Sequence, residues 1–151
     1  MMTGPEATYE RFREALLTVA GSMLAAAGYA PEDNPLHLSG GLFRFRRQHN
    51  PSLLLSVDYQ ILAHADYPAR FQVNLSRTPV SGQTPLLPVA ATSLAALLWH
   101  DFGVRVLPGP AHWWAFHDSR SLGEGLVESG RLLAGYGLPW LDGSLVPGDG
   151  A

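Results

Sequence analysis

Three consecutive segments between residues 43 and 78 alternate apolar and polar residues. In the last of them, Phe71 and Val73 alternate with Gln72 and Asn74. Because successive side chains of a β-strand point to opposite sides, this alternation is typical of strands with one buried and one solvated face. It predicts a largely antiparallel sheet that contains the strands Phe43–Arg47, Leu53–Leu62 and Arg70–Thr78.

Helical segments precede and follow these strands. Apolar residues recur at intervals of three and four from about Pro5 to Gly28, which predicts a long amphipathic helix. Further helices are expected over Thr92–Phe102 and from a Ser119 or Ser121 cap to about Tyr136. The order of elements predicts an α+β fold, an antiparallel sheet of about four to five strands with helices packed on one face, in a two-layer sandwich.

The connections and the remaining short elements can also be predicted. Pro31 and Pro35 argue against helix where they stand, and Asp66–Pro68 is expected to be a loop. Val104–Leu107 and His112–His117 are candidate strands on either side of a Pro-Gly-Pro turn. Residues 1–151 are expected to form a single α+β domain, with a flexible tail over about 142–151.

The composition excludes several classes of function. The chain has no cysteine, which excludes disulfides, thiolate metal sites and thiol catalysis. Its net charge is −3, which argues against nucleic acid as a partner. No apolar run approaches the ~20 residues of a membrane span, and the glutamates before residue 15 argue against an export signal. We therefore predict a cytoplasmic protein without membrane association.

No arrangement of residues in the sequence points to catalysis. None of the six histidines lies in a His-Glu-x-x-His frame or a His-x-His step. There is no Gly-x-Ser-x-Gly elbow, and a chain without lysine cannot form a phosphate-binding loop. We predict no catalytic residue, no metal and no cofactor.

The polar side of the predicted sheet combines short amides and hydroxyls with arginines. Such side chains can form a hydrogen-bonding platform, and arginine and tryptophan are enriched at binding hot spots. A solvated sheet face would show similar alternation, and the pattern leaves open which of Trp113 and Trp114 is buried. The predicted binding residues are Arg44, Arg46, Asp58, Gln60, Gln72, Asn74 and Trp114.

Several short motifs together resemble a known family. They are a helix that ends in Ala26-Ala27-Gly28-Tyr29, the strand Phe71-Gln72-Val73-Asn74-Leu75, the pair Trp113-Trp114, and the closing Leu138-Pro139-Trp140-Leu141. From about Tyr9 to Asp142 this layout resembles the bacterial family named domain of unknown function 4304. The chain departs from the family where Gln60 is followed by Ile61 and Leu62 instead of a polar step. The resemblance implies the same fold and supplies no catalytic residue.

Three hypotheses about function follow from the sequence. The leading hypothesis is a non-enzymatic module that binds a protein or peptide on the polar face or edge of its sheet, a role in which toxin-neutralising immunity proteins are one class. The alternative is a small-ligand or hydrolytic pocket that uses His112 or His117 with Asp118. The third is a homodimer formed through an edge strand or the Leu86–Leu87 loop.

Overall fold

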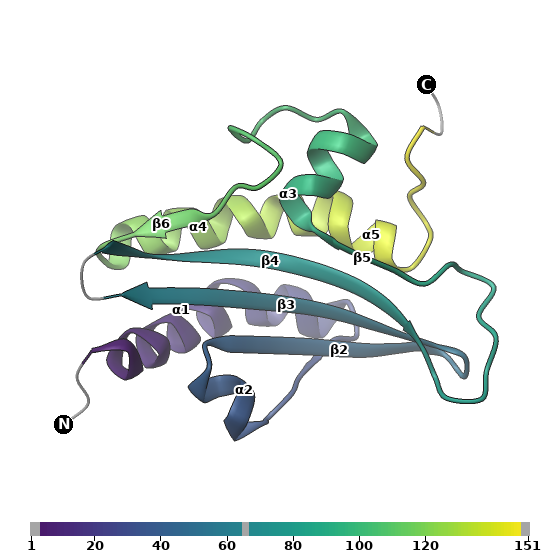
Figure 1. The fold of residues 1–151 in the computed structure, drawn as a ribbon, viewed down its shortest axis with the longest axis horizontal. Coiled ribbons are helices and arrows are strands. Elements are labelled where there is room, and N and C mark those ends of the chain that lie inside the picture. The colour runs from purple at the N-terminus through teal and green to yellow at the C-terminus, as the bar shows by residue number, and fades with distance from the viewer. Residues whose placement is uncertain (1–3, 65–66, 149–151) are drawn as a thin grey trace.

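The computed structural model describes residues 4–64 and 67–148, which form an antiparallel sheet with helices packed on one face (Figure 1). The strands lie in the order β1-β2-β3-β4-β5, and β6 also pairs with β4. The predicted α+β fold is confirmed, with six strands in the described part where about four to five were expected. The strands are β1 (Ala30–Pro31), β2 (Leu42–Asn50), β3 (Leu53–His64), β4 (Tyr67–Pro79), β5 (Ala90–Ser93) and β6 (Trp114–Phe116).

The strands β2, β3 and β4 form a meander that makes up most of the sheet. The turn between β2 and β3 is held by Asn50, whose side-chain oxygen accepts a hydrogen bond from the Ser52 N–H at 2.8 Å. Of the predicted loop Asp66–Pro68, Asp66 lies outside the described residues. Tyr67 and Pro68 already belong to β4, because Tyr67 pairs with His64 at the end of β3.

The long N-terminal helix α1 (Pro5–Ala26) packs on the apolar face of the sheet. One side of it is buried because apolar residues recur every four positions, as predicted. The helix ends just before Gly28, which has a positive φ of 90° that other residues rarely adopt. The buried stripe is Phe12, Leu16, Ala20 and Leu24.

The C-terminal helical region is continuous from residue 119 to residue 141. It consists of α4 (Ser119–Leu132), the π-helical turn η2 (Leu133–Gly137) and α5 (Leu138–Leu141). The cap is Asp118 rather than a serine: its carboxylate accepts from the Ser121 N–H at 2.7 Å, and the Ser121 hydroxyl oxygen accepts from the Asp118 N–H at 3.2 Å. The hydrogen bonds from Ser121 hold the pKa of Asp118 below its usual range.

Three short elements differ from the prediction. Pro35 begins the helix α2 (Pro35–Ser39), because proline lacks only an N–H that the first helical turn leaves unpaired. The helix expected over Thr92–Phe102 is shorter: Thr92 lies in β5, and α3 (Leu94–Ala96) passes into the π-helix η1 (Leu97–Phe102). Val104–Leu107 is not a strand; the strands that pair with this side of β4 are β5 and β6.

The core lies between the sheet and α1, and aromatic rings fill its centre. The ring centre of Phe12 is 5.2 Å from that of Phe71, 5.5 Å from Phe43 and 6.0 Å from Phe116. This burial is the main source of stability for a sheet that is covered on one side. Among the described helices, none has the length and apolar character needed to span a bilayer.

Candidate interaction face of the sheet

The sheet has one covered and one uncovered side. Figure 1 shows α1 behind β2 and β3 and α4 behind β6, so that the nearer side of the meander lies open. We call the side chains of β2, β3 and β4 on this side the open face. Its cross-strand rows are Leu62–Arg70, Leu42–Gln60–Gln72, Arg44–Asp58–Asn74, Arg46–Ser56–Ser76 and Gln48–Leu54–Thr78.

The strand register places six of the seven predicted binding residues on the open face. Arg44, Asp58 and Asn74 lie side by side in one row, and Gln60 pairs with Gln72 in the next. Side chains directly opposite one another on paired strands lie close enough to act together. These six residues therefore lie on one continuous surface.

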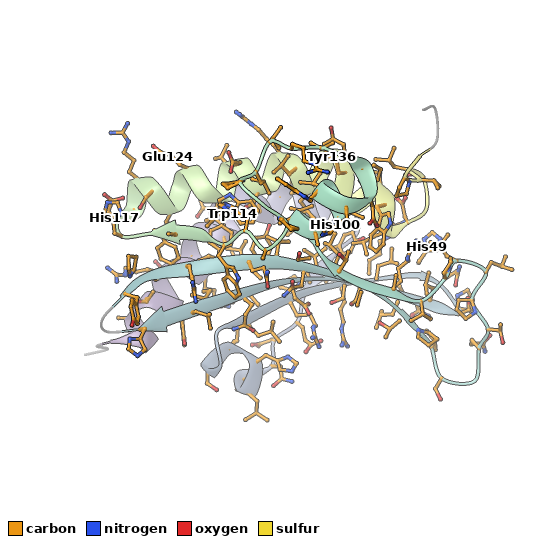
Figure 2. All side chains as sticks on the ribbon, turned by 45° about the horizontal axis from the view of Figure 1, so that its top comes forward. His49, His100, Trp114, His117, Glu124 and Tyr136 are labelled. Atoms are coloured by element: carbon orange, nitrogen blue, oxygen red, sulfur yellow. The ribbon has the colours of Figure 1, made fainter. Side chains whose placement is uncertain are left out.

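The seventh predicted residue, Trp114, does not lie on the open face. It is only 5% exposed, stacks on Phe71 with 5.4 Å between ring centres, and donates from Nε1 to Glu128 Oε1 at 2.8 Å. It thus lies beneath α4, on the apolar face (Figure 2). Because neighbouring residues of an extended chain point to opposite sides, Trp113 lies toward the open face, with the Arg70 guanidinium 5.3 Å from its ring centre.

Several polar side chains of β2 and β3 on the open face are hydrogen-bonded within the chain. Arg44 makes two parallel hydrogen bonds to Asp58, both 2.9 Å long, and the Ser56 hydroxyl donates to the same carboxylate at 2.8 Å. These hydrogen bonds from Arg44 to Asp58 raise the pKa of the Arg44 guanidinium. Gln60 donates to the Ile61 carbonyl at 3.0 Å, so it also supports the strand that carries it.

Two arginines extend the positive character of this surface. Arg46 is half exposed, and its Nε lies 3.2 Å from Glu32 Oε2, at the outer edge of β2. Arg70 is exposed at the opposite end of the open face, and among the described residues no carboxylate lies within 4.0 Å of it. Its guanidinium is therefore available to an outside carboxylate.

Three polar side chains of β4 on the open face have no hydrogen-bond partner among the described residues. Gln72, Asn74 and Ser76 are half-buried, and within residues 4–64 and 67–148 none of their side chains makes a hydrogen bond. They are alternate residues of β4, so all three point the same way. Within the described part of the chain, the donors and acceptors of these two amides and this hydroxyl are not used by other protein groups.

A hollow lies at one end of the molecule, between α1, the ends of β3 and β4, and the start of α4. Its volume is about 610 Å³, and its lining includes His64, His117 and Asp118. His117 Nε2 is 3.4 Å from Asp118 Oδ2, with both side chains largely in water. His112 does not join them, because its ring packs edge-on against Trp114 at 4.8 Å between ring centres.

The described residues form no metal-binding cluster in this hollow or on the open face. Figure 2 shows His49, His100 and His117 spread along the length of the molecule. No group of three or more histidine, aspartate or glutamate side chains in the described ranges could hold a metal ion. The hydroxyl of Ser121, which accepts a hydrogen bond from the His117 N–H at 3.0 Å, is engaged in capping α4.

Comparison with known proteins adds no further constraint. No protein-family model, no curated protein and no solved structure matches this chain. The resemblance to domain of unknown function 4304 therefore stays a prediction, and the function must be argued from the residues of the open face.

Proposed function

We propose that this chain is a non-enzymatic interaction module that binds a protein partner on the open face of its sheet. The observation that carries the proposal is the row of half-buried side chains Gln72, Asn74 and Ser76, which have no hydrogen-bond partner within the described residues. A partner that covers them must replace the lost water with matched donors and acceptors. The row therefore selects among partners.

The surroundings of this row support a binding role because they are rigid. Asp58 lies next to Asn74 across β3 and β4 and is held by Arg44 and Ser56. On the other side of β4, Phe71 and Val73 are fully buried in the core. Side chains on a preorganised strand lose little conformational entropy when they bind, which favours affinity.

The test is partner capture with variants that change the open face without touching the core. Asn74→Arg places a long charged side chain in the middle of the row, and we expect it to lose a protein that the wild-type chain captures from its source cells. Val127→Arg is the matched control, because Val127 is exposed on α4 in the other layer of the molecule. Both variants should keep the wild-type circular dichroism spectrum.

The outcome separates the open face from other surfaces. Retention of every captured protein by Asn74→Arg would show that the binding surface lies elsewhere. Analytical ultracentrifugation of the same variants addresses the homodimer hypothesis: a dimer that Asn74→Arg dissociates would identify the partner as a second copy of the chain.

The hollow at the end of the molecule favours a second candidate function, a small-ligand or hydrolytic site. Its volume of about 610 Å³ is in the range of ligand pockets, and it is lined by the His117–Asp118 pair. A thermal-shift screen of small metabolites tests this candidate. A ligand that stabilises the wild-type chain and the His112→Ala variant, but not the His117→Ala variant, would support this site. A screen that finds no such ligand would rule the site out.

A further inference from the structure

We infer that the partner of the open face is an extended, acidic peptide segment that lies along β4. This inference rests on the proposed function and adds the chemistry of the partner to it. Three observations carry it: the spacing of Gln72, Asn74 and Ser76, the sign of the charge on the open face, and the guanidinium of Arg70 beside Trp113, which has no carboxylate partner among the described residues.

The spacing of the row matches the repeat of an extended chain. Gln72, Asn74 and Ser76 are successive outward residues of one strand, so their Cα atoms are about 6.6–6.8 Å apart. An extended peptide repeats its backbone groups at the same interval when it runs along the strand. A primary amide offers both a donor and an acceptor, so Gln72 and Asn74 can each bond one peptide unit.

The charge of the open face favours an acidic segment. The face carries Arg44, Arg46 and Arg70 against the one acid Asp58, although the chain as a whole has a net charge of −3. Asp58 neutralises Arg44, and Glu32 lies beside Arg46. The positive charge left over is therefore concentrated at Arg70, at one end of the row.

Arg70 is placed to receive a carboxylate. Its guanidinium lies 5.3 Å from the ring centre of Trp113, which limits the orientations of a planar group without using its N–H donors. An arginine fork binds a carboxylate through two parallel hydrogen bonds. A glutamate or aspartate near one end of the peptide would thus fix the register of the backbone over Gln72 and Asn74.

Selection from a displayed library of random dodecapeptides tests this inference on the intact chain. We expect the enriched peptides to contain aspartate or glutamate and to be depleted in lysine and arginine. Arg70→Gln should weaken the selected peptides by about tenfold or more, because it removes a charge-assisted hydrogen-bonded pair. Arg105→Gln is the matched control: Arg105 also lies over a tryptophan, 4.1 Å from the Trp99 ring centre, but outside the meander, so its loss should leave the affinity unchanged.

The outcomes distinguish this inference from the proposed function. Peptides that bind Arg70→Gln as tightly as the wild type, but lose binding to Asn74→Arg, overturn the acidic partner and leave the open face as the binding surface. Peptides that bind Asn74→Arg unchanged, or a library that yields no enriched peptide, overturn the inference entirely. The proposed function fails separately, when Asn74→Arg still captures every wild-type partner from the cell extract.

Discussion

Alternate residues of β4 differ in burial and in contacts: those on one side are packed in the core, and those on the other side face outward. Phe71, Val73 and Leu75 are at most 1% exposed and pack against α1 and the other helices, whereas Gln72 and Asn74 face outward without a partner in the described chain. The apolar side holds the two layers together. The outward amides of β4 make no such packing contacts, so substitutions of Gln72 and Asn74 should change stability much less than substitutions of the buried residues.

The largest effect should come from a pair of neighbours on opposite sides. Phe71→Ala removes a ring that contacts Phe12, Tyr59 and Trp114, and large-to-small changes of this kind cost about 3–5 kcal/mol. Gln72→Ala should change the free energy of unfolding by no more than about 0.5 kcal/mol. Urea denaturation followed by circular dichroism measures the free energy of unfolding of both variants. Similar losses of stability would show that the two sides of β4 do not differ in their contribution to stability.

The pair Arg44 and Asp58 should give the next largest effect, because it is a polar pair on the open face with a structural role. Their side chains are 22% and 14% exposed, and Asp58→Ala leaves the guanidinium without its carboxylate. We expect a loss of about 1–3 kcal/mol. The double variant Arg44→Met/Asp58→Leu should lose less than the two single variants together, since no unpaired charge remains. Additive losses in urea denaturation would show that the two side chains do not act as a pair.

The sequence predicted the central meander and the composition of its two sides, but the placement of individual side chains depended on distant contacts. Alternation shows that Trp113 and Trp114 point to opposite sides, yet only the pairing of β6 with β4 decides which is buried. Arg77 shows more clearly that the placement of a side chain can depend on a distant contact. It lies on the apolar face, 8% exposed, because its guanidinium stacks 4.2 Å from the Trp140 ring centre and donates to the Trp140 carbonyl at 3.3 Å. A contact between residues 63 positions apart leaves no mark on local periodicity.

The pH dependence of stability should show a smaller effect at the border of the apolar face. Burial beside Trp114 lowers the pKa of His112 below its usual 6.5, while Glu128 partly opposes this. The folded chain then binds fewer protons at this site than the unfolded chain. The resulting stability is present above the unfolded pKa and is lost as the pH falls below about 6.5. His112→Gln should therefore lose less stability than the wild type between pH 8 and pH 5.5 in urea denaturation. An equal loss would show that this ring is not the titrating group.

The smallest change in stability should come from Asn74, and its sign is informative. Asparagine is depleted in β-strands and threonine is enriched, over a range of about 1 kcal/mol. Asn74 makes no side-chain hydrogen bond within the described residues, so Asn74→Thr loses no internal hydrogen bond. The variant should therefore raise the free energy of unfolding by a few tenths of a kcal/mol. The same variant should bind the partner more weakly, because a hydroxyl cannot replace an amide that offers a donor and an acceptor on separate atoms. A variant that is more stable and binds less would show that Asn74 serves recognition at a cost in stability, whereas a destabilised variant would assign it a structural role and remove it from the proposed binding row.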